Sequence, residues 1–233
     1  MKNLPLTLII VSLSFIGILH AAEHRWNQTE LGPTFSASLK PSGKGVRWEH
    51  TAKVIAIRVG ESGNAGVGFD TDMLRVVAGW TEGFVRVNPG RNALLDHHSS
   101  RGVAHFATNR KTGWSHGGEW KDHPKNNGPI PRQQGCYEGL YMHGDRVVIS
   151  YRIGTGSVIE SPWLIEKDEM RVFTRAFEVE SSLAGEQVYI CNGQSGVPTE
   201  VVVDGVKVLT RDAGNGEILA VAVIGDATAK DGG

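Results

Sequence analysis

The clearest pattern in the chain is a strict alternation of side chains between residues 145 and 153. One set of alternate positions is apolar or aromatic: Val147, Ile149, Tyr151 and Ile153. The other set carries Arg146, Val148, Ser150 and Arg152. A period of two predicts a β-strand with one buried face.

Further segments rich in β-branched and apolar residues are predicted as strands. They are residues 53–59, 73–80, 83–87, 157–160, 171–179, 186–191, 200–203, 206–209 and 217–224. Thr81 and Glu82 predict a hairpin between two of these segments, and Asp204-Gly205 predicts another by its turn chemistry. Segment 217–224 is apolar on both faces and is therefore expected to be a central strand.

These elements together predict an all-β fold. No stretch of twelve residues after the leader has a helical period, and 30 of the 233 residues are glycine. Many short strands with glycine-rich turns favour a sandwich of antiparallel sheets, here with one long ordered loop region. We expect one domain over residues 23–224. Its predicted core contains Val147, Ile149, Tyr151, Phe173, Phe177, Val221 and Val223.

Residues 88–135 are the predicted loop region. They contain few strand signals and much Gly, Pro, Asn and His. Loops longer than about 12–15 residues are usually functional or disordered. Trp114 and Trp120 and the low net charge favour an ordered segment here.

The first 22 residues predict a secretory signal peptide. Lys2 is the only charge before Glu23, an apolar run follows it, and Ala21 and Ala22 offer a cleavage site. The alternative is an uncleaved anchor, since the uncharged stretch is close to the length of a membrane span. We therefore expect an exported protein, periplasmic or extracellular, with no other membrane segment. Residues 225–233 are polar and predict a linker or a truncated end.

Charge and short motifs exclude several classes. Lys and Arg number 24 and Asp and Glu 25, a net charge of −1, which argues against nucleic-acid binding by bulk charge. No GxSxG, P-loop or GxGxxG motif is present, so no catalytic residue is assigned. No CxxCH motif is present either, so we expect no cofactor in this chain. Cys136 and Cys191 either form a disulfide, which export would permit, or remain two small buried thiols.

The histidines offer a candidate metal site. His97, His98 and His105 lie in the loop region. Asp96 and Asp122 lie in the same region, and Asp145 follows it. Their spacing matches no zinc pattern, so hydrogen-bonded loop histidines are the alternative.

Residues 137–145 carry aromatic and polar side chains that an extended backbone would place on one side. Such a face suits a sugar, because rings stack while polar groups bind hydroxyls. The alternative is a turn at His143–Asp145 with tyrosines packed in the core. The candidate ligand-binding residues are Trp114, Trp120, Arg132, Tyr137, His143 and Asp145, with Trp80 as a further aromatic platform. We expect the loop region to bring His97, His98, His105 and His143 toward one end of the sandwich.

Four segments resemble one bacterial family, the domain of unknown function 6797 family. They are residues 69–85 (FDTDMLRVVAGWTEGFV), 103–108 (VAHFAT), 139–162 (GLYMHGDRVVISYRIGTGSVIESP) and 172–179 (VFTRAFEV). The resemblance covers about residues 32–224. It implies an exported module of planctomycete-like and verrucomicrobial bacteria, often preceding a dehydrogenase-like propeller and a c-type haem domain. It implies no catalytic residues.

Two functions remain open at this point. The first is a non-catalytic accessory or ligand-binding module, associated with carbohydrate and with a downstream haem or dehydrogenase domain. The second is a metal-assisted hydrolase or lyase that uses the histidine cluster.

Overall fold

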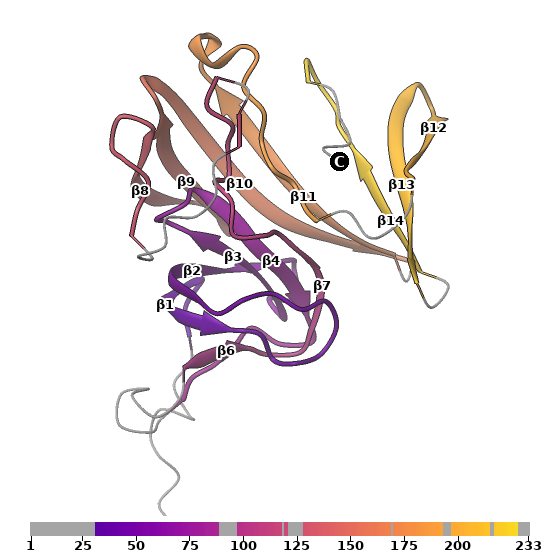
Figure 1. Ribbon diagram of the computed structural model, residues 1–233. Helices are drawn as coiled ribbons and strands as arrows, with labels where there is room; N and C mark the ends of the chain where they lie inside the picture. Colours follow the sequence, from indigo (N-terminus) through magenta and orange to yellow (C-terminus); the bar gives the residue numbers. More distant parts are fainter. Residues whose placement is uncertain are drawn as a thin grey trace, which may run out of the picture.

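The computed structural model describes residues 31–88, 97–117, 119–120, 128–168, 170–192, 197–214 and 217–227 (Figure 1). The predicted signal peptide, residues 1–22, lies outside the described residues. In the described part of the chain, no helix has the length and apolar character needed to cross a membrane.

The largest sheet has seven strands. Their spatial order is β5 (Val85–Arg86), β6 (His98–Ser100), β1 (Thr34–Lys40), β2 (Thr51–Val59), β3 (Ala65–Asp70), β4 (Arg75–Thr81) and β7 (Val103–Ala107). All neighbours are antiparallel except β1 and β6, which are parallel.

A second sheet has four antiparallel strands that follow one another in the chain as a meander. Its order is β11 (Met170–Val179), β10 (Gly156–Lys167), β9 (Arg146–Ile153) and β8 (Gly135–His143). A short 3-10 helix, η3 (Ser181–Leu183), follows β11. The inner face of this sheet packs against the seven-stranded sheet, which confirms the predicted all-β architecture (Figure 1).

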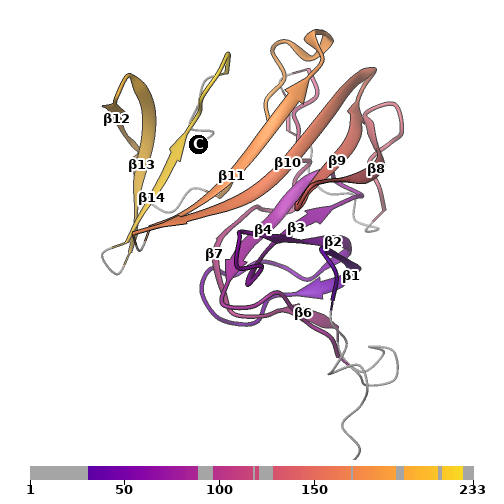
Figure 2. The same cartoon turned by 180° about the vertical axis from the view of Figure 1, so that it is seen from behind.

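The C-terminal strands form a third sheet in the order β12 (Thr199–Val203), β13 (Val206–Gly214) and β14 (Glu217–Ala222). Both ribbon views show this sheet beside β11, apart from the two larger sheets (Figure 2). The Asp204-Gly205 hairpin is confirmed: both turn residues have positive φ, 50° and 81°, as a type I′ turn requires.

The prediction of a central strand at residues 217–224 was wrong. β14 is an edge strand, and Val221 and Val223 lie outside the two buried clusters. Apolar residues on both faces do not distinguish a central strand from a strand in a small, thinly covered sheet.

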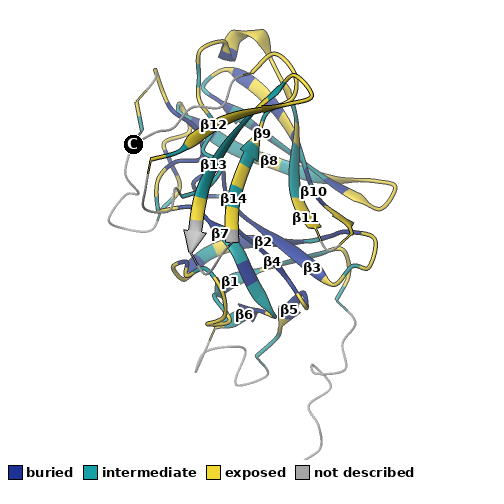
Figure 3. Ribbon diagram, turned by 90° about the vertical axis from the view of Figure 1, so that its right-hand side faces the viewer, coloured by how far each residue is buried: buried dark blue, intermediate teal, exposed yellow. Residues whose placement is uncertain are grey.

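The main core lies between the seven-stranded and four-stranded sheets. The β9 residues predicted for it are buried. Phe173 and Phe177 of β11 are partly buried and pack against this core. A second cluster fills the opposite, concave face of the seven-stranded sheet, around Trp48, Trp80 and Phe84. β3 and β4 are therefore buried along their whole lengths (Figure 3).

Trp80 explains one of the glycines in β3. Its indole lies so close to Gly66 that a Cβ there would be 2.5 Å from the ring. The indole nitrogen donates a 2.6 Å hydrogen bond to the Phe84 carbonyl. Because Trp80 is fully buried, its predicted role as a surface platform was wrong.

Two local predictions also failed. β4 pairs with β3 and β7 rather than with the segment after Thr81 and Glu82, which pairs with β6 instead. Segment 186–191 forms no strand and is joined to the rest by an isolated bridge between Val188 and Trp114. Of the long region at 88–135, the described parts include β6 and β7; residues 89–96, 118 and 121–127 lie outside the described residues.

Candidate binding surface

The outer face of the four-stranded sheet is the best-formed exposed surface that contains a predicted site residue. Its composition follows from the alternation in β9: the odd-numbered residues point into the core, so Arg146, Val148, Ser150 and Arg152 point outward. Residues directly opposite one another in a ladder share a face. Tyr141 faces Val148, and His143 faces Arg146 across β8 and β9.

β10 and β11 extend this face with larger apolar groups. Trp163 pairs with Thr174, and Ile165 pairs with Val172, all on the outward side by strand alternation. Trp163 is half-buried and also packs against the main core. The exposed fractions are 60% for Tyr141, 49% for Ile165 and 43% for Val172. A solvent-facing side of an antiparallel sheet is normally polar, so this amount of apolar exposure makes the face a candidate binding surface.

A cation–π contact lies at the end of the face where β8 turns into β9. The Arg146 guanidinium carbon lies 4.5 Å from the centroid of the Trp163 ring. A guanidinium over an aromatic ring keeps its positive charge and its N–H donors beside an apolar surface. At the edge of the sheet, Arg152 forms a 2.6 Å ion pair with Glu138, which orients a second guanidinium.

The face thus combines one exposed phenol ring, one stacked indole–guanidinium pair and an imidazole. Tyr141 and Trp163 lie two strands apart, roughly 10–12 Å from the strand spacing and rise. Rings spaced in this way can stack on alternate units of an extended polymer while Arg146 and His143 bind its hydroxyls. We refer to Tyr141, His143, Arg146 and Trp163 as the sheet-face site.

The structure separates the other residues predicted near His143. Asp145 is exposed in the turn beside it, whereas Tyr137 lies on the inner face, where burial and then Tyr141 raise its pKa. Arg132 is exposed three residues before β8 begins. It lies in the turn at one end of β8, whereas His143 lies at the other end, about 26 Å along the strand, too far for both to bind one small ligand.

The two predicted tryptophans also lie elsewhere. Trp114 is buried in the main core, and its indole nitrogen donates a 3.0 Å hydrogen bond to the Tyr151 hydroxyl. Trp120 is half-buried against Tyr189, with 5.5 Å between ring centroids. Neither residue reaches the sheet-face site.

The histidines do not converge as expected. His105 bonds Thr81 at 2.7 Å and lies 6.0 Å from Phe173 of β11, at the opposite edge of the four-stranded sheet from β8, which carries His143. His98 accepts a hydrogen bond from the Asn88 amide, and burial, followed by the neighbouring His97, lowers its pKa. Among the described residues, no three His, Cys, Asp or Glu side chains are placed to hold a metal ion. Asp96, Asp122 and His123 lie outside the described residues.

Both cysteines are free thiols in the structure. Cys136 accepts a 3.0 Å hydrogen bond from Arg152 on β9. Burial raises the pKa of Cys191, against the opposing effect of Arg175 and Arg211. The structure therefore shows thiols and no disulfide, and both thiols are half-buried rather than fully buried.

Sequence reasoning placed Tyr141 on one face with His143 but did not include it among the candidate site residues, and it missed Arg146 and Trp163. The available signal was the alternation of side chains between the two faces of β9. Once Val147 and Ile149 are assigned to the core, the even-numbered residues of β9 must face outward. To predict that Trp163 lies beside Arg146, the register of β10 against β9 was needed as well.

No curated protein and no solved structure matches the chain. A family model does match, over residues 67–160, which contain β4, β7, β8, β9 and most of the sheet-face site. Residues 67–160 thus confirm the resemblance expected from the sequence: this part of the chain matches the family described as Domain of unknown function (DUF6797).

Proposed function

We propose that the chain is a non-catalytic, exported carbohydrate-binding module that uses the sheet-face site. The observation that carries this proposal is the Arg146–Trp163 stack beside the exposed Tyr141 ring. Flat aromatic surfaces bind the apolar faces of sugar rings, and the neighbouring guanidinium and imidazole bind hydroxyl groups.

The chemistry of the face favours binding over catalysis. Its described residues offer no nucleophile held by a base, which nucleophilic catalysis requires. An open surface also leaves a ligand largely solvated, whereas catalytic groups depend on exclusion of water. The metal-assisted hydrolase remains without a supporting observation.

The proposal includes an accessory role in a larger redox protein, as the family resemblance implies. On this view the module holds a polysaccharide while a dehydrogenase or c-type haem domain, encoded beyond Gly233, acts on it. Sequencing the coding region past this residue for a CxxCH motif tests that part of the proposal. An immediate stop codon there would refute it.

Affinity electrophoresis against soluble β-glucan, xylan, mannan and pectin tests the binding function. We expect retardation by at least one polysaccharide. Tyr141→Ala and Arg146→Ala should each weaken binding about tenfold, the loss of roughly 1.4 kcal/mol of stacking or hydrogen bonding.

Arg86→Ala is the matched control, since Arg86 is exposed on β5 of the other sheet. It should bind like the unaltered protein, and all three variants should keep its melting temperature. Absence of binding to every polysaccharide, or an equal loss in the control, would overturn the sheet-face assignment.

A further inference from the structure

A pocket on the seven-stranded sheet is built quite differently from the sheet-face site. It lies where β2 begins and where the β3–β4 turn folds over it. Its volume is about 80 Å³ and its lining is His50, Thr51, Ala52, Asp70, Asp72, Arg75 and Arg110. A site for one ordered water needs about 10–15 Å³ on this measure, so the pocket has room for several waters or one small polar molecule.

The floor of the pocket is a buried ion pair. Asp70 ends β3, Arg75 begins β4, and the two residues pair in the ladder. Asp70 caps the turn between them by accepting hydrogen bonds from the Asp72 and Met73 amides at 3.0 and 3.2 Å. Arg75 Nε lies 3.3 Å from Asp70 Oδ2, and both side chains are 2% exposed.

Arg75 keeps donor capacity on the side that lines the pocket. Its Nη1 donates to the Thr108 carbonyl and hydroxyl and to the Asn109 carbonyl. Its Nη2 carries two N–H groups, and its contact among the described residues is Thr51 Oγ1 at 3.5 Å. A bond of that length is weak, so a ligand oxygen could take its place.

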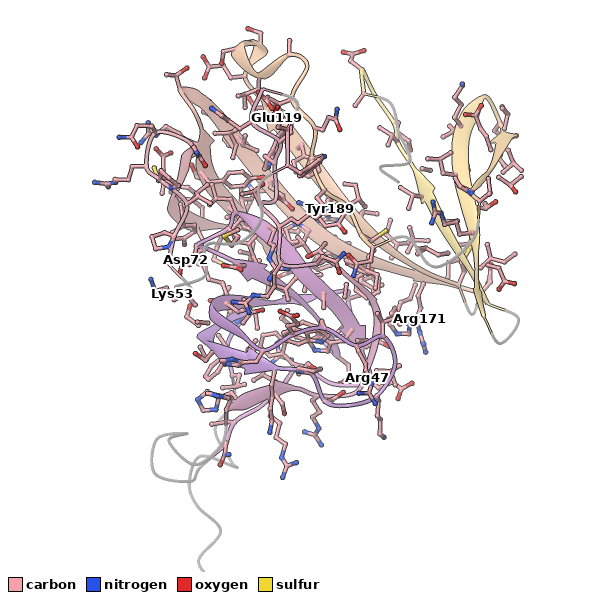
Figure 4. All side chains as sticks on the ribbon, in the orientation of Figure 1. Arg47, Lys53, Asp72, Glu119, Arg171 and Tyr189 are labelled. Atoms are coloured by element: carbon pink, nitrogen blue, oxygen red, sulfur yellow. The ribbon has the colours of Figure 1, made fainter. Side chains whose placement is uncertain are left out.

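The rim continues the same pairing of opposite charges. Lys53 Nζ lies 3.2 Å from Asp72 Oδ1, and the two side chains lie close together near the start of β2 (Figure 4). Arg110 Nε lies 3.3 Å from Glu49 Oε2. Each of the three carboxylates in or beside the pocket therefore has a basic partner.

His50 lines one side of the pocket and stacks on His97. The His50 and His97 ring centroids are 3.9 Å apart with 20° between the planes. Burial, followed by His97 and Arg110, lowers the pKa of His50, which favours its neutral form. A neutral His50 ring adds no charge to the paired carboxylates and basic groups of the pocket.

We propose that this pocket binds a single neutral sugar unit through adjacent hydroxyl groups. A hydroxyl both donates and accepts hydrogen bonds, and the pocket offers guanidinium donors next to carboxylate acceptors. An oxyanion would meet the Asp70 and Asp72 carboxylates, and a cation would meet the Arg75 and Arg110 guanidinium groups. The sugar class rests on the proposed function, but the pocket and the sheet-face site use no common residue.

Calorimetric titration with glucose, galactose, mannose and xylose tests the pocket, with glucuronate and inorganic phosphate as anionic probes. We expect at least one neutral sugar to bind and the anions to bind more weakly or not at all. Arg110→Gln and Asp72→Asn should each weaken sugar binding about tenfold, as expected for one charge-assisted hydrogen bond.

Asp72 is buried, so its replacement also affects folding, whereas Arg110 is half-exposed and its replacement should change stability less. Arg171→Gln, at an exposed arginine of β11 in the four-stranded sheet and outside the pocket lining, is the control and should leave binding unchanged. Tyr141→Ala should also bind the monosaccharide normally, even where polysaccharide retardation is lost.

Three outcomes would overturn the pocket assignment: no neutral sugar binds, an anion binds more tightly, or Arg110→Gln binds as well as the control. If the pocket fails while polysaccharides still bind through Tyr141, the proposed function stands alone. If monosaccharides bind but polysaccharides do not, only the sheet-face assignment fails.

Discussion

Glu160 and Arg175 form an ion pair on adjacent strands, β10 and β11, inside the core. Glu160 is fully buried and the Arg175 side chain is 8% exposed. The same carboxylate accepts a 2.8 Å hydrogen bond from Tyr151, whose pKa is raised well above its usual value by burial and then by Glu160. Arg175 in turn donates to the Tyr189 carbonyl, so the pair ties the segment after β11 to the sheets.

Replacement of Glu160 by Gln should destabilise the fold by about 3–5 kcal/mol, because it leaves a buried guanidinium without its counterion. Urea denaturation followed by tryptophan fluorescence measures this. Glu138→Gln is the control: its ion pair with Arg152 is exposed and screened by solvent, so this variant should lose much less stability than Glu160→Gln. Equal losses in the two variants would mean that the Glu160 pair is not buried.

Truncation of Ile149 to Ala should cost about 2–5 kcal/mol, since its side chain is fully buried between the two larger sheets. Val221→Ala should cost about 1 kcal/mol or less, because Val221 lies half-buried in the separate C-terminal sheet. The two free energies of unfolding come from the same urea experiment. A larger cost at Val221 than at Ile149 would contradict the assignment of the core.

The depressed pKa values of His50 and His98 predict that stability depends on pH below the ordinary histidine value of 6.5. The folded state then binds fewer protons than the unfolded state, so stability rises with pH in this window. The contribution of the two neutral histidines to stability is fully present above pH 6.5 and is lost as the pH falls through their folded-state pKa values. Unfolding curves at several pH values should show this slope, and it should flatten in His50→Gln and His98→Gln. An unchanged slope in both variants would refute the linkage.

Ellman's reagent should detect both cysteines in denatured protein that has never met a reductant, because both thiols are free. In the folded protein Cys191 should react slowly, since burial raises its pKa and lowers the thiolate fraction. Cys191→Ser should remove the slow phase. Recovery of thiols only after reduction would instead indicate a disulfide.

Local patterns predicted much of this fold correctly. The alternation at residues 146–153 identified β9 and its buried face, and Asp204-Gly205 identified the β12–β13 hairpin. These features depend on neighbours in sequence: a strand alternates its faces by geometry, and a type I′ turn needs residues that tolerate positive φ. The all-β class and the family resemblance followed from the same local information.

Contacts between distant segments decided the rest. Trp114 is a residue type on which ligands often stack, but it lies in the core, where it donates a hydrogen bond to Tyr151, 37 residues away. His105 and His143 are both plausible ligands, yet sheet order places them at opposite edges. The stack of Arg146 on Trp163 depends on the register of β9 against β10, and the pocket at Arg75 depends on β2 lying beside the β3–β4 turn. Sequence spacing alone does not determine such pairings, because strand order and register are set by how the whole core packs.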